Sequence, residues 1–230
     1  MAIDIVVLSG GLGTRIRPVF NGPKGLAPVR GKPVVAHVID WCLGAGPSRI
    51  IVAAGYRGRE LRNVVYGLYQ DRVDVLTEDT PLGTAGCIIP LLPLLDDPFI
   101  VVNGDTLVDG NLPQMWQHHV EAESMATVGV VETDRTDVGR LALQHPPPSR
   151  VLEFQEKGAT AHPWTSAGVY IFQQNCFKSP PSLPASLETD VLPRLASSGQ
   201  LQAYPLKRIY DIGTPERFKE VEENWWTRFR

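Results

Sequence analysis

Short apolar runs alternate with segments of helical periodicity through the first 105 residues, and this order limits the fold more than any other feature. The strand-like runs lie at 3–8, 49–54, 73–76 and 99–102, and the helical segments at 34–43 and 61–68. Strands that alternate with helices favour a mostly parallel sheet that is covered on both faces. We therefore expect a Rossmann-like α/β/α three-layer structure, and the 43% hydrophobic residues are enough to fill its core.

The rest of the chain departs from this regular order. A helix is expected to begin at residue 83, but Pro90 and Pro93 disfavour its continuation to residue 95. Shorter strands, which we expect to add antiparallel pairings and so make the sheet mixed, follow at 126–131, 140–143, 151–155 and 167–172. A helix is expected over about 187–196, and the capping sequence Thr214-Pro215-Glu216 predicts the start of a last helix.

Charge and cysteine content exclude several classes of protein. The formal net charge of -3 gives no reason to expect a nucleic acid or an acidic membrane surface as partner. The three cysteines are scattered, which argues against a disulfide scaffold or a structural zinc site and favours a reducing compartment. No apolar run reaches the roughly 18 residues of a spanning helix, and no signal segment precedes the first strand. We expect a cytoplasmic protein.

A glycine-rich loop directly follows the first strand. Gly10, Gly11 and Gly13 leave backbone N–H groups open to an anion, and Arg15 adds a guanidinium that suits phosphate oxygens. Lys24 places a second cation between turn-forming residues. The spacing is neither that of a dinucleotide fold nor that of a phosphate loop with Gly-Lys-Ser/Thr. Taken alone, the segment is explained equally well as a tight turn with a surface arginine.

Asp105 ends the fourth strand-like run, after Asn103 and Gly104. Ligands of open parallel sheets lie beyond the carboxyl ends of the strands. The glycine loop and Asp105 leave their strands at the same edge, so we expect them to converge on one crevice. A solvated turn aspartate is the alternative.

Five stretches together resemble the sugar-1-phosphate nucleotidylyltransferase family, and they lie at 10–24, 78–86, 103–105, 156–157 and 210–215. The resemblance runs from residue 3 to residue 219. The short length and the Pro-Leu-Gly-Thr-Ala-Gly loop at 81–86 are similar to guanylyltransferases for mannose 1-phosphate and, above all, for D-glycero-α-D-manno-heptose 1-phosphate. Long members of the family carry a C-terminal left-handed β-helix, for which this chain has no room.

The resemblance implies a nucleotide-diphospho-sugar transferase fold in a single domain of 230 residues, with nucleotide bound by about 1–110 and sugar phosphate by about 111–230. It also implies an Mg²⁺-dependent reaction of a nucleoside triphosphate, here GTP, with a sugar 1-phosphate. The implied catalytic residues are Arg15, Lys24 and Asp105, and the implied metal ligands are Asp105 and Asp211. Asp211 has the alternative role of organising the entry to the last helix.

The resemblance assigns further residues to each substrate. The implied nucleotide-binding residues are Leu8, Gly10, Gly11, Gly13, Thr14, Arg15, Glu78, Pro81, Gly83, Thr84 and Gly104. The Glu78 carboxylate matches the N1–H and N2–H₂ edge of guanine, although a solvated strand-end residue explains it equally well. The implied sugar-phosphate-binding residues are Gly139, Glu156, Lys157, Ser166 and Gly168.

Two positions depart from the family pattern. Ser166 stands where asparagine is usual, which suggests an atypical acceptor sugar, and Gly25 stands where proline usually follows the lysine. We expect Gly25 to loosen the loop around Lys24 without removing its charge.

Other functions remain open at this point. The alternative acceptors are mannose 1-phosphate and N-acetylmuramate 1-phosphate, and the alternative donors are UTP and dTTP. A non-catalytic nucleotide-sugar-binding regulatory module is a further alternative, disfavoured by the complete set of charged residues. The glycine spacing disfavours a nicotinamide dehydrogenase. A homo-oligomer is possible, because Trp225 and Trp226 either cover the core or meet another subunit.

Overall fold

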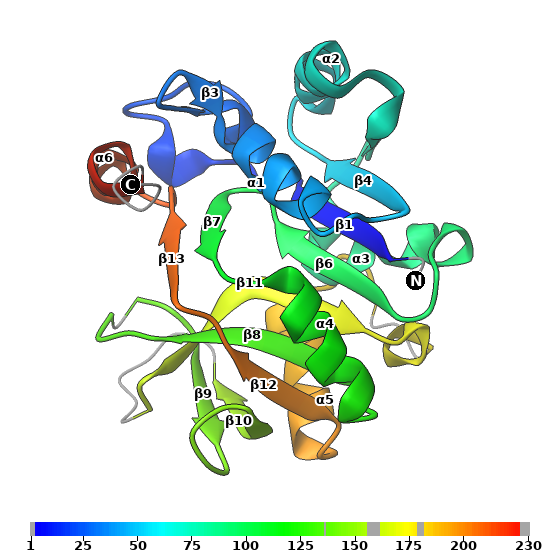
Figure 1. Ribbon diagram of the computed structural model, residues 1–230. Helices are drawn as coiled ribbons and strands as arrows, with labels where there is room; N and C mark the ends of the chain where they lie inside the picture. The colour runs from blue at the N-terminus through cyan, green and yellow to red at the C-terminus, as the bar shows by residue number, and fades with distance from the viewer. Residues whose placement is uncertain (1–2, 136, 156–161, 179–181, 226–230) are drawn as a thin grey trace.

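The computed structural model describes residues 3–135, 137–155, 162–178 and 182–225. Over these residues, the main sheet has nine strands in the order β5-β4-β1-β6-β11-β8-β12-β10-β9 (Figure 1). The strands are β1 (Asp4–Ser9), β4 (Arg49–Ala54), β5 (Asp74–Thr77), β6 (Phe99–Asn103), β8 (Ala126–Glu132), β9 (Arg140–Leu143), β10 (Ser149–Gln155), β11 (Trp164–Phe172) and β12 (Leu201–Pro205). Strands from both halves of the chain therefore share one sheet.

The parallel strands of the first half and the antiparallel pairings of the second lie where the sequence predicts them, but β12 was not predicted. Strands β5, β4, β1 and β6 are parallel neighbours. Strand β11 is antiparallel to both β6 and β8, and β12 returns parallel to β8. In the β1–β6 pair Leu8 lies opposite Asn103, so the glycine loop and the turn that holds Asp105 leave the sheet side by side.

Helices cover both faces of the sheet, which confirms the three-layer prediction. One face packs against α1 (Val34–Leu43), α2 (Gly58–Tyr69) and α4 (Leu112–Glu121). The other packs against α3 (Gly83–Gly86), η4 (Ile89–Leu94), η5 (Gln174–Phe177), η6 (Leu187–Val191) and α5 (Leu192–Ser197). The alternation of side chains along a strand builds both cores, since Ile5 and Val7 enter the first and Val6 the second.

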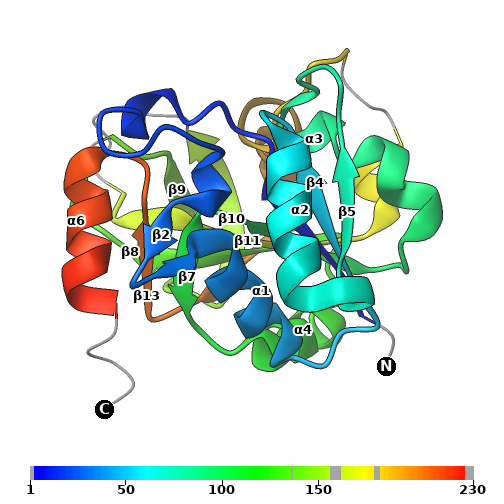
Figure 2. The same ribbon diagram turned by 90° about the horizontal axis from the view of Figure 1, so that it is seen from above.

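Two small sheets of two strands each accompany the main sheet among the described residues. Strand β7 (Thr106–Asp109) pairs antiparallel with β13 (Arg208–Asp211), and β2 (Pro28–Val29) pairs with β3 (Lys32–Pro33). The last helix, α6 (Pro215–Asn224), contacts β2 and β13, far from α2 in the view from above (Figure 2). Short 3₁₀ turns complete the chain: η1 (Thr14–Ile16), η2 (Lys24–Leu26) and η3 (Gln70–Arg72).

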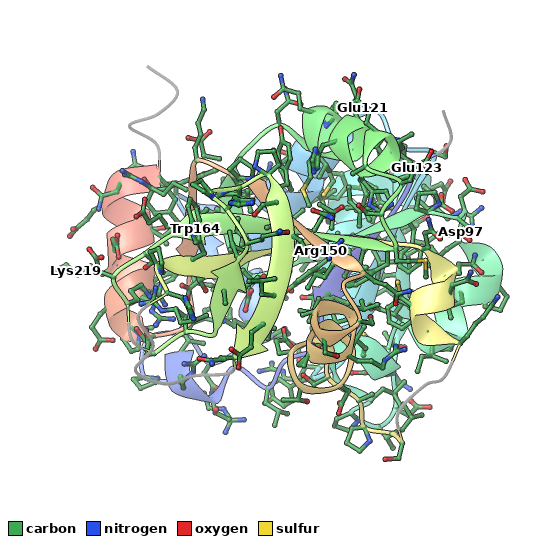
Figure 3. The ribbon with its side chains drawn as sticks, turned by 90° about the horizontal axis from the view of Figure 1, so that it is seen from below. Asp97, Glu121, Glu123, Arg150, Trp164 and Lys219 are labelled. Atoms are coloured by element: carbon green, nitrogen blue, oxygen red, sulfur yellow. The ribbon has the colours of Figure 1, made fainter. Side chains whose placement is uncertain are left out.

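Helix α6 begins as its capping sequence predicts. The Thr214 hydroxyl accepts a hydrogen bond from the N–H of Arg217, and Pro215 is the first helical residue. Its inner face buries Val221, whereas Lys219 points away from the helix into solvent (Figure 3). The ring of Trp225 packs edge-on against Tyr210, while Trp226 lies outside the described residues.

Two predicted helices are less regular than the sequence suggests. After α3 the chain continues as 3₁₀ helix, because prolines 90 and 93 lack the N–H that an α-helix needs. The segment that begins at Leu187 opens as a π-turn, since Pro193 has no N–H for the α-helical bond to Thr189. None of the helices among the described residues combines the length and apolar composition needed to cross a membrane.

Candidate active site

Two pockets flank the glycine loop at the carboxyl edge of the parallel strands. The first has a volume of about 610 Å³ and is walled by β6–β7, the β8–β9 connection, β11, β13 and α6. The second, of about 600 Å³, is walled by the glycine loop, the turn into α2 and the segment after β5. The loop contributes Arg15 to the first pocket and Gly10 to the second. It therefore links the two.

The glycine loop turns sharply into η1. Gly13 has a φ of 60°, and a Cβ there would lie 3.3 Å from the Cβ of Lys24. Ile16 is fully buried and anchors the turn, which leaves Thr14 and Arg15 exposed. Position 13 thus needs glycine both because its backbone is left-handed and because Lys24 approaches it closely.

Lys24 and Asp105 meet at the mouth of the first pocket. Lys24 Nζ lies 2.5 Å from Asp105 Oδ2, and the hydroxyl of Thr106 donates to Asp105 Oδ1 at 3.0 Å. The Lys24 side chain is only 16% exposed and that of Asp105 is 32% exposed. Gly104 donates its N–H to the carbonyl of Leu8, which ties this turn to the end of β1. The lysine ammonium therefore points into the site and not into bulk solvent.

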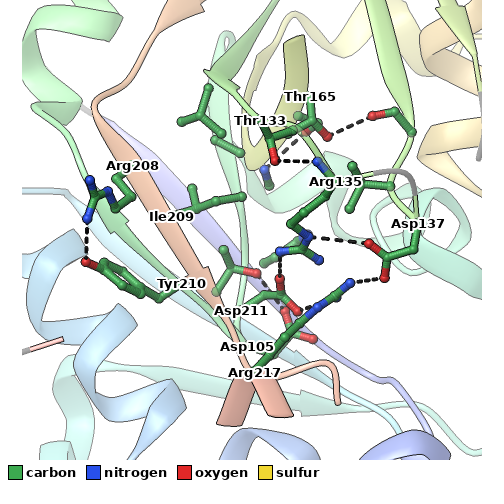
Figure 4. Close-up of a pocket in the computed structure, with 18 of the residues that line it drawn as sticks. Asp105, Thr133, Arg135, Asp137, Thr165, Arg208, Ile209, Tyr210, Asp211 and Arg217 are labelled. Carbon is green, nitrogen blue, oxygen red and sulfur yellow. Dashed lines mark hydrogen bonds and ion pairs between the residues drawn. The ribbon is translucent and has the colours of Figure 1, made fainter. Parts of the chain in front are cut away.

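Asp211, on the neighbouring strand β13, lies between two arginines (Figure 4). Arg135 Nη1 is 2.8 Å from Asp211 Oδ2, and Arg217 Nη1 is 2.9 Å from Asp211 Oδ1. Both arginines also pair with Asp137. Burial raises the pKa of the Asp211 carboxyl, but the two guanidinium groups outweigh burial and hold the pKa below its usual range.

The sequence did not single out Arg135, Asp137 or Arg217. Their charges act through partners up to 80 residues away, and such pairs leave no local pattern in the sequence. The one available signal is the spacing from Asp211 to Arg217, which brings the first turn of α6 back over the end of β13.

Asp105 and Asp211 line the same pocket. The antiparallel β7–β13 pair sets Asp211 opposite Thr106, and Ile212 donates its N–H to the backbone carbonyl of Asp105. Within the described ranges no three His, Cys, Asp or Glu residues gather as a metal cluster. Mg²⁺ requires only one or two carboxylates besides water and substrate phosphates. The two aspartates fit that donor set.

Glu78 lies in the second pocket, close to two glycines. A Cβ on Gly10 or Gly55 would approach Glu78 Oε1 to 2.9 or 2.6 Å, so the carboxylate lies directly against both backbones. Burial raises the pKa of the Glu78 carboxyl, and the N–H of Leu82 donates to Glu78 Oε2 at 3.4 Å. The sequence prediction missed the contribution of the turn 55–60 to this pocket.

The predicted nucleotide-binding residues do not all line a pocket. Arg15 lies in the first pocket, and Gly10, Glu78 and Pro81 in the second. The remaining predicted residues lie outside both pocket walls, namely Leu8, Gly11, Gly13, Thr14, Gly83, Thr84 and Gly104.

The hydroxyl of Thr84 is hydrogen-bonded to the start of η6. Its hydroxyl donates to Glu188 Oε2 at 2.8 Å and accepts the N–H of Leu187 at 2.8 Å. Gly83 has a φ of 81° and packs on the carbonyl of Ala185. The loop 81–86 is thereby fixed against the start of η6.

The predicted acceptor side is partly described. Gly139, Ser166 and Gly168 all line the first pocket, whereas Glu156 and Lys157 lie outside the described residues. The Ser166 hydroxyl is hydrogen-bonded to the Tyr170 hydroxyl at 2.9 Å and accepts the N–H of Gly168 at 3.1 Å.

Gly25 does not loosen its loop as predicted. It is buried within the 3₁₀ turn η2, and a Cβ there would lie 2.5 Å from Ser9 Oγ. The turn is closed by hydrogen bonds from Leu26 to Pro23 and from Ala27 to Lys24. Glycine is needed at position 25 because the packing leaves no space for a Cβ, and not because the loop is flexible.

Comparison with known proteins defines the family. The family model described as nucleotidyl transferase matches residues 4–227. The chain belongs to the nucleotidyl transferase family. Mannose-1-phosphate guanyltransferase of Aspergillus fumigatus is 30% identical over 223 residues, which cover 93% of this chain and 61% of that protein. Mannose-1-phosphate guanylyltransferase of Mycobacterium tuberculosis is 31% identical over 241 residues, covering 94% and 62%. The chain thus spans about three fifths of the length of these relatives.

Solved structures match the chain over nearly its whole length. HddC from Yersinia pseudotuberculosis is 28% identical with a TM-score of 0.82, covering 97% of this chain and 99% of that one. The same protein complexed with GMP-PN is 29% identical with a TM-score of 0.81, over the same shares of each chain. UDP-glucose pyrophosphorylase is 18% identical with a TM-score of 0.82, covering 100% of both chains, and this likeness shows the fold alone.

Proposed function

We propose that this nucleotidyl transferase condenses GTP with a sugar 1-phosphate to give a GDP-sugar and pyrophosphate. One observation carries the proposal: the glycine loop joins two pockets, and the Lys24–Asp105 pair lies beside it in the first. One pocket suits a nucleoside and the other a phosphorylated acceptor. The triphosphate would span the loop between them.

In this reaction an oxygen of the acceptor phosphate attacks the α-phosphorus of GTP. The bond from the α-phosphorus to the bridging oxygen of the β-phosphate breaks, and pyrophosphate leaves with that electron pair. Both reactants are anions, so positioning and charge neutralisation supply most of the catalysis. Lys24 places its ammonium at the mouth of the first pocket, where it suits a non-bridging oxygen of the α-phosphate. Arg15 follows the loop and suits the leaving β- and γ-phosphates.

Asp105 and Asp211 are the residues that would hold Mg²⁺. Bound there, Mg²⁺ would supply positive charge to substrate phosphate oxygens. In its absence Lys24 neutralises the first carboxylate and the two arginines neutralise the second. The site therefore balances its carboxylates with side chains that are themselves suited to phosphate.

Glu78 supports guanine as the base. Its carboxylate lies in the second pocket and presents acceptor oxygens to the N1–H and N2–H₂ donors of guanine. Uracil and thymine would present an acceptor carbonyl to the same group. The complex of HddC with GMP-PN is in keeping with a guanine nucleotide.

For the acceptor we propose D-glycero-α-D-manno-heptose 1-phosphate, on the resemblance of the loop 81–86 to that branch of the family. The names of the relatives from Aspergillus fumigatus and Mycobacterium tuberculosis favour mannose 1-phosphate as the second candidate. The two sugars present the same manno-configured ring with its 1-phosphate. The first pocket, at about 610 Å³, has room for either.

A donor-by-acceptor activity matrix tests the proposal. The protein is incubated with Mg²⁺, each of GTP, UTP, dTTP and ATP, and each of the two sugar phosphates, while pyrophosphate is measured. We expect release with GTP and a manno-configured acceptor. Absence of release with every pair would refute the proposal, and tight binding of a nucleotide sugar in that case would favour a regulatory module.

A further inference from the structure

The arginine pair around Asp211 has features of an anion site. Arg135 Nη2 is buried and has no hydrogen-bond partner among the described residues, although Nη1 and Nε of the same group are engaged. A buried donor without an acceptor is costly and uncommon in folded proteins. The Arg135 side chain is 34% exposed and lines the first pocket, so a small shift of the guanidinium would bring Nη2 to an oxygen of a ligand there.

Hydrogen bonds from a buried arginine, Arg140, fix the backbone that carries Arg135. Arg140, only 4% exposed, donates to the backbone carbonyls of Thr133, Arg135 and Pro163. Arg217 is held at the other wall by the first turn of α6 and is only 15% exposed. Both guanidinium groups are therefore positioned before any ligand arrives, which lowers the entropic cost of binding.

Gly213 marks the point at which the positive charges gather. A Cβ on Gly213 would lie 2.6 Å from Asp211 Oδ1, 3.1 Å from Arg217 Nη1 and 3.5 Å from Arg15 Nη2. Arg135 binds the other oxygen of Asp211, so two guanidinium groups contact this carboxylate and that of Arg15 lies near Gly213. Asp137 supplies only one more negative charge. The cluster thus has one positive charge more than its two carboxylates balance.

The position of Arg135 within the cluster favours the acceptor over the nucleoside. Arg135 comes from the β8–β9 connection, which also carries Gly139 and lies beside Thr165, whose hydroxyl donates to the Gly139 carbonyl. This wall faces Ser166 on β11 and lies away from the second pocket, to which Glu78 belongs. The Nη2 group of Arg135 carries two N–H donors, and such donors suit phosphate oxygens.

We propose that Arg135 and Arg217 bind the phosphate of the acceptor, and that Asp211 and Asp137 hold the two guanidinium groups in position for it. The inference rests on the proposed function, because it assigns a substrate group within the same site. Arg135 contacts that phosphate through Nη2, and Asp211 keeps its own hydrogen bond to Nη1.

Steady-state kinetics of Arg135→Gln and Arg217→Gln test the assignment, with GTP and whichever of mannose 1-phosphate or the heptose 1-phosphate wild-type protein uses better. We expect the KM of the acceptor to rise at least about tenfold in each variant, while the KM of GTP changes less than about threefold. Arg135→Lys keeps the positive charge but loses the planar set of N–H donors. Its acceptor KM should therefore lie between the values of wild-type protein and Arg135→Gln.

Arg208→Gln is the matched control. Arg208 lines the same pocket, but its guanidinium lies on the other side of β13, against the Tyr210 hydroxyl (Figure 4). The variant loses the same charge, and its acceptor KM should stay within about twofold of wild type. Thermal unfolding of every variant is measured alongside.

The outcomes separate the two proposals. If wild-type protein releases no pyrophosphate with either acceptor, the proposed function fails and this inference fails with it. If the wild type is active and the glutamine variants leave the acceptor KM unchanged, the inference alone is overturned. A rise confined to the KM of GTP, or an equal rise in Arg208→Gln, overturns it as well.

Discussion

Lys24 Nζ lies 2.5 Å from Asp105 Oδ2, so two turns that are 81 residues apart in the sequence meet in one ion pair. The pair forms where β1 and β6, which are adjacent and parallel, both end. Each partner fixes the other at the mouth of the first pocket. An uncompensated charge in so enclosed a place would be unfavourable, and the pairing removes that penalty.

Asp105→Asn should lower turnover by a factor of about 10²–10³, which is about 3–4 kcal/mol of barrier. The change removes the carboxylate that positions Lys24 and that we propose as an Mg²⁺ ligand, but it preserves the shape of the side chain. Pyrophosphate release measures the loss, and thermal unfolding checks that the fold is kept. Asp109→Asn, in the strand that follows, is the control and should retain activity. Near-wild-type turnover of Asp105→Asn would contradict its assignment.

Glu78→Gln should raise the KM of GTP about tenfold and flatten its dependence on pH. Burial raises the pKa of Glu78 above its usual range. As the pH falls through that raised value, wild-type protein protonates the carboxyl and loses an acceptor for the guanine edge, so its KM should rise. Glutamine does not titrate and should remove this rise. An unchanged KM in the variant would exclude contact between Glu78 and the base.

Gly83→Ala should destabilise the protein by about 2–4 kcal/mol, because a Cβ at φ 81° is strained and meets the carbonyl of Ala185. Gly67→Ala is the matched control. Gly67 lies in α2 with open space around it, so alanine there should stabilise by about 0.5–1 kcal/mol. Urea unfolding measures both. Equal effects of the two substitutions would show that Gly83 is not needed to seat the loop 81–86.

Acid should weaken the fold through His119. The ring is buried, its Nδ1 lies 2.8 Å from Thr127 Oγ1, and burial lowers its pKa to about 4. An unfolded histidine titrates near about 6.5. Between these two pKa values, His119 is protonated in the unfolded chain and neutral in the folded one. The free energy of unfolding therefore falls as the pH falls, by up to about 3 kcal/mol.

Urea unfolding from pH 7 to pH 4 tests this prediction. His119→Gln should lose that part of the pH dependence, whereas the exposed His145→Gln should keep it. Identical pH profiles for wild type and His119→Gln would show that another group is responsible.

The parallel half of the fold was predictable because its signals are local. Each of the strands β1, β4 and β6 contains an apolar run of four or five residues. The rule that ligands lie beyond the carboxyl ends of such strands predicts that the glycine loop and Asp105 converge. Strands β7, β12 and β13 were not predicted. Strands β7 and β13 pair with each other outside the main sheet, and polar residues interrupt the apolar pattern of β12 and β13.

The charged groups around Asp211 show the limit of sequence reasoning more clearly. Asp211 carried a motif, but Arg135 and Asp137 lie in a turn-rich segment in which any charged residue looks solvated. They are brought to Asp211 only because the β8–β9 connection folds over the end of β13, and Arg135 is 76 residues distant from its partner. The family resemblance likewise contained no information on the turn 55–60, which lines the second pocket.

Strand β13 makes the pocket depend on a pairing outside the main sheet. Strand β12 belongs to the main sheet, and the next strand, β13, crosses to β7 and brings Asp211 beside the turn of Asp105. The crossing is fixed on both sides, since Leu206 donates its N–H to the carbonyl of Val130 and Lys207 donates its N–H to the carbonyl of Asp109. A substitution that breaks the β7–β13 ladder would therefore displace one carboxylate of the pocket and leave the nine-stranded sheet intact.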